Sequence, residues 1–143
     1  MTSRPATIAD VPLLAEFNHQ LIRDERHHNP MTVPQLAVRM QGWLESKEYR
    51  AEIFEDGREV IAYAIFREDP SELHLRQFFV VRDRRRKRHG KAAMQLLFNA
   101  VWPANKRITV EVLADNAAAL GFYRALGFND YAVTLEMPAK GVV

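Results

Sequence analysis

The chain has 143 residues, of which 20 are Lys or Arg, 18 are Asp or Glu and none is Cys. This length predicts one domain over residues 1–143, and the 48% apolar content argues against disorder. No apolar run approaches the ~20 residues of a membrane span, and the N-terminal segment lacks the apolar stretch of a signal peptide. Without Cys there is no disulfide framework, thiolate nucleophile or cysteine metal cage, so a cytoplasmic protein is expected.

The charge is unevenly distributed along the chain. Residues 82–91 hold seven basic residues and one Asp, a balance of +6. The other 133 residues carry 13 basic and 17 acidic side chains, a balance of −4. A small basic patch is therefore expected on a mildly acidic body.

Two helices are predicted at the start of the chain. Asp10 caps the first, whose apolar residues Leu14, Phe17 and Leu21 share one face. After a polar loop, Thr32 caps the second helix. Its apolar stripe consists of Leu36, Met40, Trp43 and Leu44.

From Arg50 the apolar period changes to that of strands. Two strands are predicted around Asp56-Gly57, a pair that favours a tight hairpin turn. The second of them, residues 60–66, is almost wholly apolar, which indicates a central place in the sheet. A third strand is predicted over residues 73–81.

The second half of the chain alternates helix and strand. A helix follows the basic run and ends before Pro103, a strand covers residues 107–113, and Asn116 caps a helix that Gly127 closes. Residues 132–137 alternate again and are predicted to form a last strand. Strand–helix–strand steps imply parallel pairing, so the expected fold is a mixed α/β sheet with an antiparallel N-terminal half, flanked by about four helices.

The basic run lies where a strand passes into a helix. Such a loop presents unbonded N–H groups and the positive end of the helix dipole, which bind phosphate. Gly90 permits close approach to the backbone, and Arg85, Arg86, Lys87 and Arg88 surround it with charge. A solvated face and a nucleic-acid patch are the alternatives. The position before a helix, and the lack of aromatic residues for base stacking within the run, favour a phosphate site.

Two blocks of the chain resemble the GNAT N-acetyltransferase superfamily. In the first, residues 79–94, Arg85 and Gly90 stand at the first and last positions of the family's signature, which follows a strand and opens a helix. The second block, residues 110–128, resembles the strand, Asn, Phe-Tyr helix and Gly-Phe of the family's second half. Arg88 stands where the family usually has its first Gly. We expect a right-handed backbone there, with Arg88 as an extra phosphate partner, and the alternative is weaker coenzyme binding.

The resemblance implies acetyl-CoA as the acetyl donor, with no metal. Its pantetheine arm would lie where two major strands splay apart, on the main chain of Phe79, Val80 and Val81. Asn116 would reach the pantetheine region, and Tyr123 would lie near the sulfur. The residues expected at the pyrophosphate are Arg85, Arg86, Lys87, Arg88, His89, Gly90 and Lys91.

Acetyl transfer to an amine needs a neutral amine, a polarised thioester carbonyl and a proton for the leaving thiolate. In this family the amine attacks directly. The phenol of Tyr123 is expected to donate the proton, and a strand N–H near Val80 to polarise the carbonyl. The residues left open as the base are Glu72, His74, Asp24 and Glu25.

The resemblance places the acceptor between the first two helices. The polar loop there predicts Asp24, Glu25 and His28 as binding residues for a polar or amine-bearing acceptor. A metal at His27-His28 is rejected, because adjacent histidines point apart and no third ligand has matching spacing.

The leading prediction is an acetyl-CoA-dependent N-acetyltransferase acting on a primary amine of a small molecule or peptide. The alternatives are a coenzyme-A-binding regulatory module without catalysis and a nucleic-acid-binding domain that uses residues 82–91. No membrane partner is expected, and edge strands and exposed termini are compatible with a homodimer.

Overall fold

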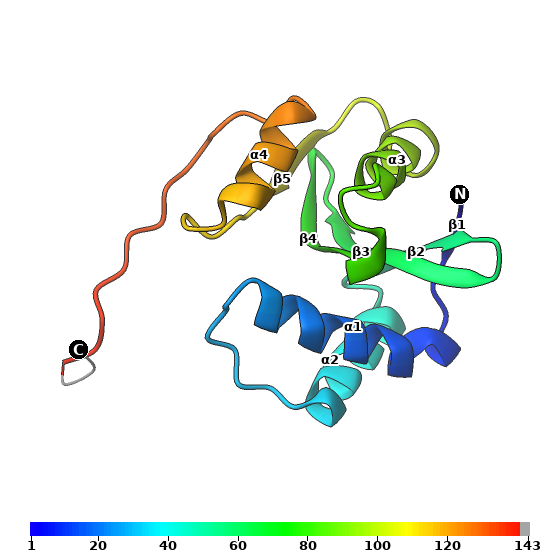
Figure 1. Ribbon diagram of the computed structural model, residues 1–143, viewed down its shortest axis with the longest axis horizontal. Coiled ribbons are helices and arrows are strands. Elements are labelled where there is room, and N and C mark those ends of the chain that lie inside the picture. The colour runs from blue at the N-terminus through cyan, green and yellow to red at the C-terminus, as the bar shows by residue number, and fades with distance from the viewer. Residues whose placement is uncertain (141–143) are drawn as a thin grey trace. The chain divides into compact units, whose positions relative to one another are not determined.

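The computed structural model describes residues 1–140, which fall into two compact units, Met1–Leu113 and a second that begins at Ala114. The first unit is built on a five-stranded sheet with the order β1-β2-β3-β4-β5 (Figure 1). Its strands are β1 (Thr2–Pro5), β2 (Arg50–Asp56), β3 (Glu59–Glu68), β4 (Glu72–Val80) and β5 (Arg107–Val110).

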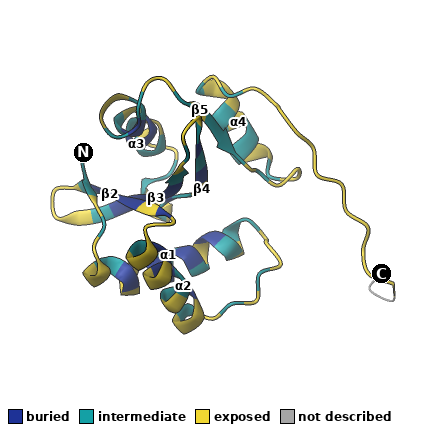
Figure 2. Ribbon diagram, turned by 180° about the vertical axis from the view of Figure 1, so that it is seen from behind, coloured by how far each residue is buried: buried dark blue, intermediate teal, exposed yellow. Residues whose placement is uncertain are grey.

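The sheet has the mixed pairing that the sequence predicts. Strands β1 to β4 pair antiparallel, and β4 pairs with β5 in parallel. β3 lies in the middle and is buried along most of its length (Figure 2), as its apolar sequence indicates. The mixed α/β fold and the central position of β3 are confirmed.

Helices cover both faces of the sheet. Helices α1 (Val11–Asp24) and α2 (Val33–Ser46) lie on one side, and α3 (His89–Leu96) lies on the other (Figure 1). On the α1 side, Phe17 contacts the rings of Tyr63 and Phe79 at 6.3 and 5.1 Å between centroids. On the α3 side, Phe66 packs edge-on against Trp102 at 5.6 Å.

Two of the predicted N-caps form the expected hydrogen bonds, whereas the side chain of Asp10, the residue before α1, forms no cap bond. Thr32 Oγ1 accepts from the Gln35 N–H at 3.3 Å, and Asn116 Oδ1 accepts from the Ala119 N–H at 3.1 Å at the start of α4 (Ala117–Ala125). Gly127 has a φ of 105° just after α4, as the predicted C-terminal glycine requires.

Three short helical turns complete the fold. The 3-10 turn η1 (Ile8–Asp10) precedes α1, and the 3-10 turn η2 (Arg82–Arg84) follows β4. Helix α3 continues into the π-helical turn η3 (Leu97–Val101).

Two strand predictions differ from the structure. β1 was not expected, because four residues that include Pro5 are too short to show a period of two. The predicted strand at 132–137 is wrong, since these residues belong to none of the strands in residues 1–140. Val133, Leu135 and Met137 are 82%, 89% and 90% exposed, and Figure 2 shows this segment in the exposed colour. Alternation gives a tendency to extend, whereas a strand also needs a neighbour with which to form hydrogen bonds.

In residues 1–140, no helix combines the length and the apolar character needed to cross a lipid bilayer.

Candidate functional site

β4 extends beyond its pairing with β5. Their parallel pairing runs from Glu72–Arg107 to Leu75–Val110 and stops there, whereas β4 continues to Val80 beside β3. The Val81 N–H donates to Ile61 O at 2.9 Å and so points to β3. Because neighbouring residues of a strand alternate, the Val80 N–H points to the other, open side. The parallel pairing of β4 with β5 is as predicted, the edge of β4 beyond Leu75 has no strand partner on this side, and the amide of Val81 is already used within the sheet.

The loop after β4 turns sharply into α3. Arg86 has a φ of 61°, and Arg88, the residue before α3, has a φ of 65° and a ψ of 7°. The expected right-handed backbone at Arg88 is wrong. The chain must turn from η2 into α3 within four residues, and Arg88 takes the left-handed conformation for which glycine is best suited. This conformation costs a non-glycine residue about 1 kcal/mol or more.

The first turn of α3 presents backbone donors. The Ala92 N–H is bonded to Arg88 O at 3.0 Å, so the earlier amides of His89, Gly90 and Lys91 precede the helical hydrogen-bond pattern. These donors lie at the positive end of the helix dipole, which favours an anion. His89 Nδ1 lies 3.1 Å from Arg84 O and ties the helix start to the loop.

The basic side chains of residues 82–91 form two groups. Arg84 bonds Asp56 and Glu59 of the β2–β3 hairpin at 2.6 and 2.8 Å, and Arg82 and Arg85 bond Asp24. A second group forms no ion pair within residues 1–140 and is available to a phosphate. Its members are Arg86, Lys87, Arg88 and Lys91.

Arg85 connects the end of β4 to the end of α1. Its Nε donates to Val80 O at 2.8 Å, its Nη2 donates to Asp24 Oδ2 at 2.7 Å, and its guanidinium lies 5.2 Å from the centre of the Phe79 ring. Arg82 Nη2 donates to the other Asp24 oxygen at 2.6 Å. Burial disfavours the charged carboxylate, but the hydrogen bonds and charges of Arg85 and Arg82 outweigh it and lower the pKa of Asp24.

The four residues left open as the base lie in different surroundings. Glu72 Oε2 accepts from Arg107 at 2.6 Å, and His74 Nδ1 lies 2.8 Å from Thr109 Oγ1, both where β4 is still paired with β5. The carboxylate of Asp24 accepts hydrogen bonds from Arg82 and Arg85. Glu25 is partly buried just after α1, and its burial and the charge of Asp24 raise its pKa. Among the four, Glu25 combines a raised pKa with a position at the end of α1.

Comparison with known proteins decides the family. Residues 15–128 match the model of the Acetyltransferase (GNAT) family. The chain belongs to this family. The GNAT resemblance of the two sequence blocks is thereby confirmed, and no curated protein matches the chain.

Solved structures share the GNAT fold at low identity. The tetramutant of the BH1408 protein from Bacillus halodurans is 22% identical, with a TM-score of 0.77 over 97% of this chain and 100% of that one. An aminoglycoside antibiotic 6′-N-acetyltransferase from Acinetobacter haemolyticus is 16% identical, with a TM-score of 0.76 over 98% and 99%. A predicted acetyltransferase with acetyl-CoA from Clostridium acetobutylicum is 17% identical, with a TM-score of 0.73 over 96% and 95%.

The second unit of the GNAT chain carries two of the predicted site residues. Asn116 caps α4, as the sequence predicts. Tyr123 lies on α4, and its ring packs edge-on against Phe122 and Phe128 at 5.1 and 5.4 Å between centroids. Their roles towards coenzyme A stay predictions.

Several contacts around the candidate site do not follow from the sequence pattern. Asp24 and Arg85 are 61 residues apart, and no local pattern pairs them. Tyr63 is fully buried and donates to Gln77 Oε1 at 2.9 Å on the α1 side of β4. Gln77 follows a β-bulge in β4, which a strand pattern alone does not reveal.

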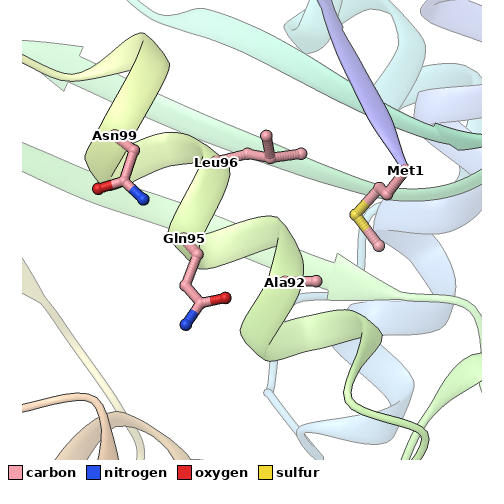
Figure 3. Close-up of a pocket in the computed structure, with 5 residues that line it drawn as sticks. All are labelled: Met1, Ala92, Gln95, Leu96 and Asn99. Atoms are coloured by element: carbon pink, nitrogen blue, oxygen red, sulfur yellow. The ribbon is translucent and has the colours of Figure 1, made fainter.

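A hollow on the surface is lined by other residues of the chain. Met1 and residues of α3 and η3 line it, and Figure 3 shows no predicted site residue among them.

Within residues 1–140, no three His, Cys, Asp or Glu side chains gather as metal ligands. His28 is exposed in the loop between α1 and α2.

Proposed function

We propose that the protein transfers an acetyl group from acetyl-CoA to the primary amine of a small molecule or peptide by direct attack. One observation carries this proposal: the open end of β4 runs directly into a loop and a helix start that suit an anion. A strand edge for the pantetheine arm thus lies next to a site for the pyrophosphate.

The residues present fit coenzyme A. The amides of His89, Gly90 and Lys91 offer donors to the pyrophosphate. Further charge comes from the basic side chains that form no ion pair within residues 1–140, which are Arg86, Lys87, Arg88 and Lys91. When bound, acetyl-CoA supplies an acetyl group activated as a thioester.

Val80 would act on the acetyl carbonyl. Its N–H points to the open side of β4, where it would donate a hydrogen bond to the acetyl oxygen and so stabilise the negative charge that develops there. Arg85 holds the strand in place by bonding Val80 O on that same side at 2.8 Å. Direct attack by the amine needs no thiolate of the enzyme, which agrees with the absence of Cys from the sequence.

Glu25 would remove the proton from the attacking amine. Burial and the charge of Asp24 raise its pKa, which makes it a stronger base than an ordinary carboxylate. Asp24 has a lowered pKa, and Glu72 is held by Arg107, so both are poorer candidates. Tyr123 remains the proposed proton donor to the leaving thiolate.

Calorimetry tests the first half of this proposal. Acetyl-CoA and desulfo-CoA are titrated into the protein, and both are expected to bind, because both carry the pyrophosphate. The double variant Arg86→Ala, Lys87→Ala should bind more weakly, whereas Arg58→Ala on the β2–β3 turn is the matched control. No heat with either ligand at high protein concentration contradicts the proposal, and binding without release of thiol in the presence of amines identifies a regulatory module.

A further inference from the structure

Two arginines share one tryptophan ring on the α1 side of the sheet. Arg39 of α2 lies 4.5 Å from the centre of the Trp43 ring, and Arg76 of β4 lies 4.9 Å from the same centre. Arg76 Nη1 also donates to the hydroxyl of Tyr49 at 3.2 Å. Two guanidinium groups from different elements are thus held against one aromatic surface.

The two positive charges have no negative partner in the described chain. Arg39 donates to the neutral Asn18 Oδ1 at 3.2 Å, and within residues 1–140 neither Arg39 nor Arg76 forms an ion pair. Burial and the charge of Arg76 lower the pKa of Arg39. Arg67 differs, because it also bonds the Tyr49 hydroxyl but has Asp69 at 3.5 Å. An anion beside Arg39 and Arg76 would offset their mutual repulsion.

Two buried donors lie at the same place without an acceptor. Arg39 Nε and Asn18 Nδ2 are both buried and have no hydrogen-bond partner in the described chain. Asn18 is only 1% exposed. Buried donors are nearly always satisfied in folded proteins, so these two indicate a group that accepts hydrogen bonds.

We propose that Arg39, Arg76 and Asn18 bind a carboxylate of the acceptor, so that the substrate is a small aminocarboxylic acid. A carboxylate is planar, accepts at two oxygens and matches the donor fork of arginine. This inference rests on the proposed acetyl transfer, since it names the acceptor of that reaction. Asp24, the last residue of α1, does not argue for a purely cationic acceptor, because Arg82 and Arg85 neutralise its charge.

The position of Arg76 suits this role. It precedes Val80 by four residues of β4, so the two Cα atoms are about 13 Å apart along the strand. The long side chain of Arg76 can cover part of this distance. Arg76 is exposed, so a ligand can reach it, and Arg39 is partly buried behind it. An acceptor with its carboxylate at Arg76 can therefore direct its amine along β4 towards the proposed thioester site.

Fluorescence of Trp43 measures binding without relying on catalysis. In a Trp102→Phe background Trp43 is the remaining tryptophan of the two in the chain. A panel of amino acids is titrated with coenzyme A present, each paired with the amine that lacks the carboxylate. The amino acids are expected to bind about ten- to hundredfold more tightly than their paired amines. Equal binding within pairs, or no binding of any member, overturns the proposal.

Variants then assign the preference to the two arginines. Arg76→Gln should reduce the ratio of the paired affinities to near one, and Arg39→Lys, which keeps the charge, should retain part of it. Arg67→Gln is the matched control and should keep the full ratio, because Arg67 already has a carboxylate partner. A ratio that survives in Arg76→Gln overturns the proposal, as does tighter binding of inorganic phosphate than of any carboxylate.

Coenzyme titration on the same preparations separates the two proposals. Coenzyme binding with no preference for carboxylates overturns the acceptor assignment and leaves the proposed acetyl transfer intact. Carboxylate binding that depends on Arg76, without coenzyme binding, supports the anion site and contradicts acetyl transfer. Urea unfolding of each variant excludes loss of the fold as the cause.

Discussion

Asp24 joins the end of α1 to the loop after β4 by accepting a hydrogen bond from Arg85 at 2.7 Å. Arg85, the first residue of the GNAT-like signature, therefore holds the end of α1 against the loop and also lies beside the proposed phosphate site. Glu25, the proposed base, is the next residue after Asp24, so this contact also fixes the place of the base.

Replacing Asp24 with Asn should change how stability depends on pH. The pKa of Asp24 is lower in the folded than in the unfolded chain, so its charge stabilises the fold above the ordinary carboxyl range. That stability is lost as the pH falls from the ordinary value through the lowered one. In urea unfolding, wild type should exceed Asp24→Asn at neutral pH, and the gap should close in acid. A gap that is independent of pH contradicts the ion-pair account.

Replacing Arg88 with Gly should stabilise the free protein. Glycine adopts a φ of 65° without strain, so the free energy of unfolding should rise by about 1 kcal/mol. Lys87→Gly is the control, because Lys87 has no positive φ and glycine there only adds flexibility. Urea unfolding measures both, and a loss of stability in Arg88→Gly would show that the side chain outweighs the strain.

Replacing Glu25 with Gln should lower activity and raise stability. A carboxyl whose pKa is raised on folding opposes folding once the pH is above its ordinary value, so removing it stabilises the fold at neutral pH. As a base it acts when deprotonated, so the wild-type kcat/KM should rise with pH through the raised pKa, and this limb should vanish in the variant. An unchanged pH profile would assign the base to another residue.

Replacing Tyr123 with Phe should slow turnover by roughly a hundredfold and leave coenzyme binding unchanged. The phenyl ring keeps the packing against Phe122 and Phe128, and urea unfolding measures whether the variant keeps its fold. Tyr131→Phe, at a side chain that is 83% exposed, is the matched control. Equal turnover in Tyr123→Phe and wild type would return Tyr123 to a purely structural role.

Two leucines should respond very differently to truncation. Leu14 is fully buried, so Leu14→Ala should cost about 2–5 kcal/mol of the free energy of unfolding. Leu135 is 89% exposed, and Leu135→Ala should cost less than about 0.5 kcal/mol. A large cost at Leu135 would show that residues 132–137 are covered in solution.

Much of the fold is predictable because its signals are local. Thr32 and Asn116 cap their helices by bonds to residues three positions later, and the apolar run of β3 marks it as central. The proposed phosphate loop is predictable for the same reason, since a basic run and Gly90 meet at one helix start.

The remaining features depend on residues that are distant in sequence. The pairing of Asp24 with Arg85, and of Arg39 and Arg76 with one tryptophan, arises only when the helices dock on the sheet. The left-handed backbone at Arg88 reflects the turn that joins η2 to α3, which overrides the local preference of arginine.

The most direct test of acetyl transfer is the amine-dependent release of thiol from acetyl-CoA, with the acetylated product identified by mass spectrometry. The account predicts thiol release that requires the amine, matches the acetylated amine in amount, and falls sharply in Glu25→Gln and Tyr123→Phe. Tight binding of acetyl-CoA with no acetylated product from any amine would contradict it.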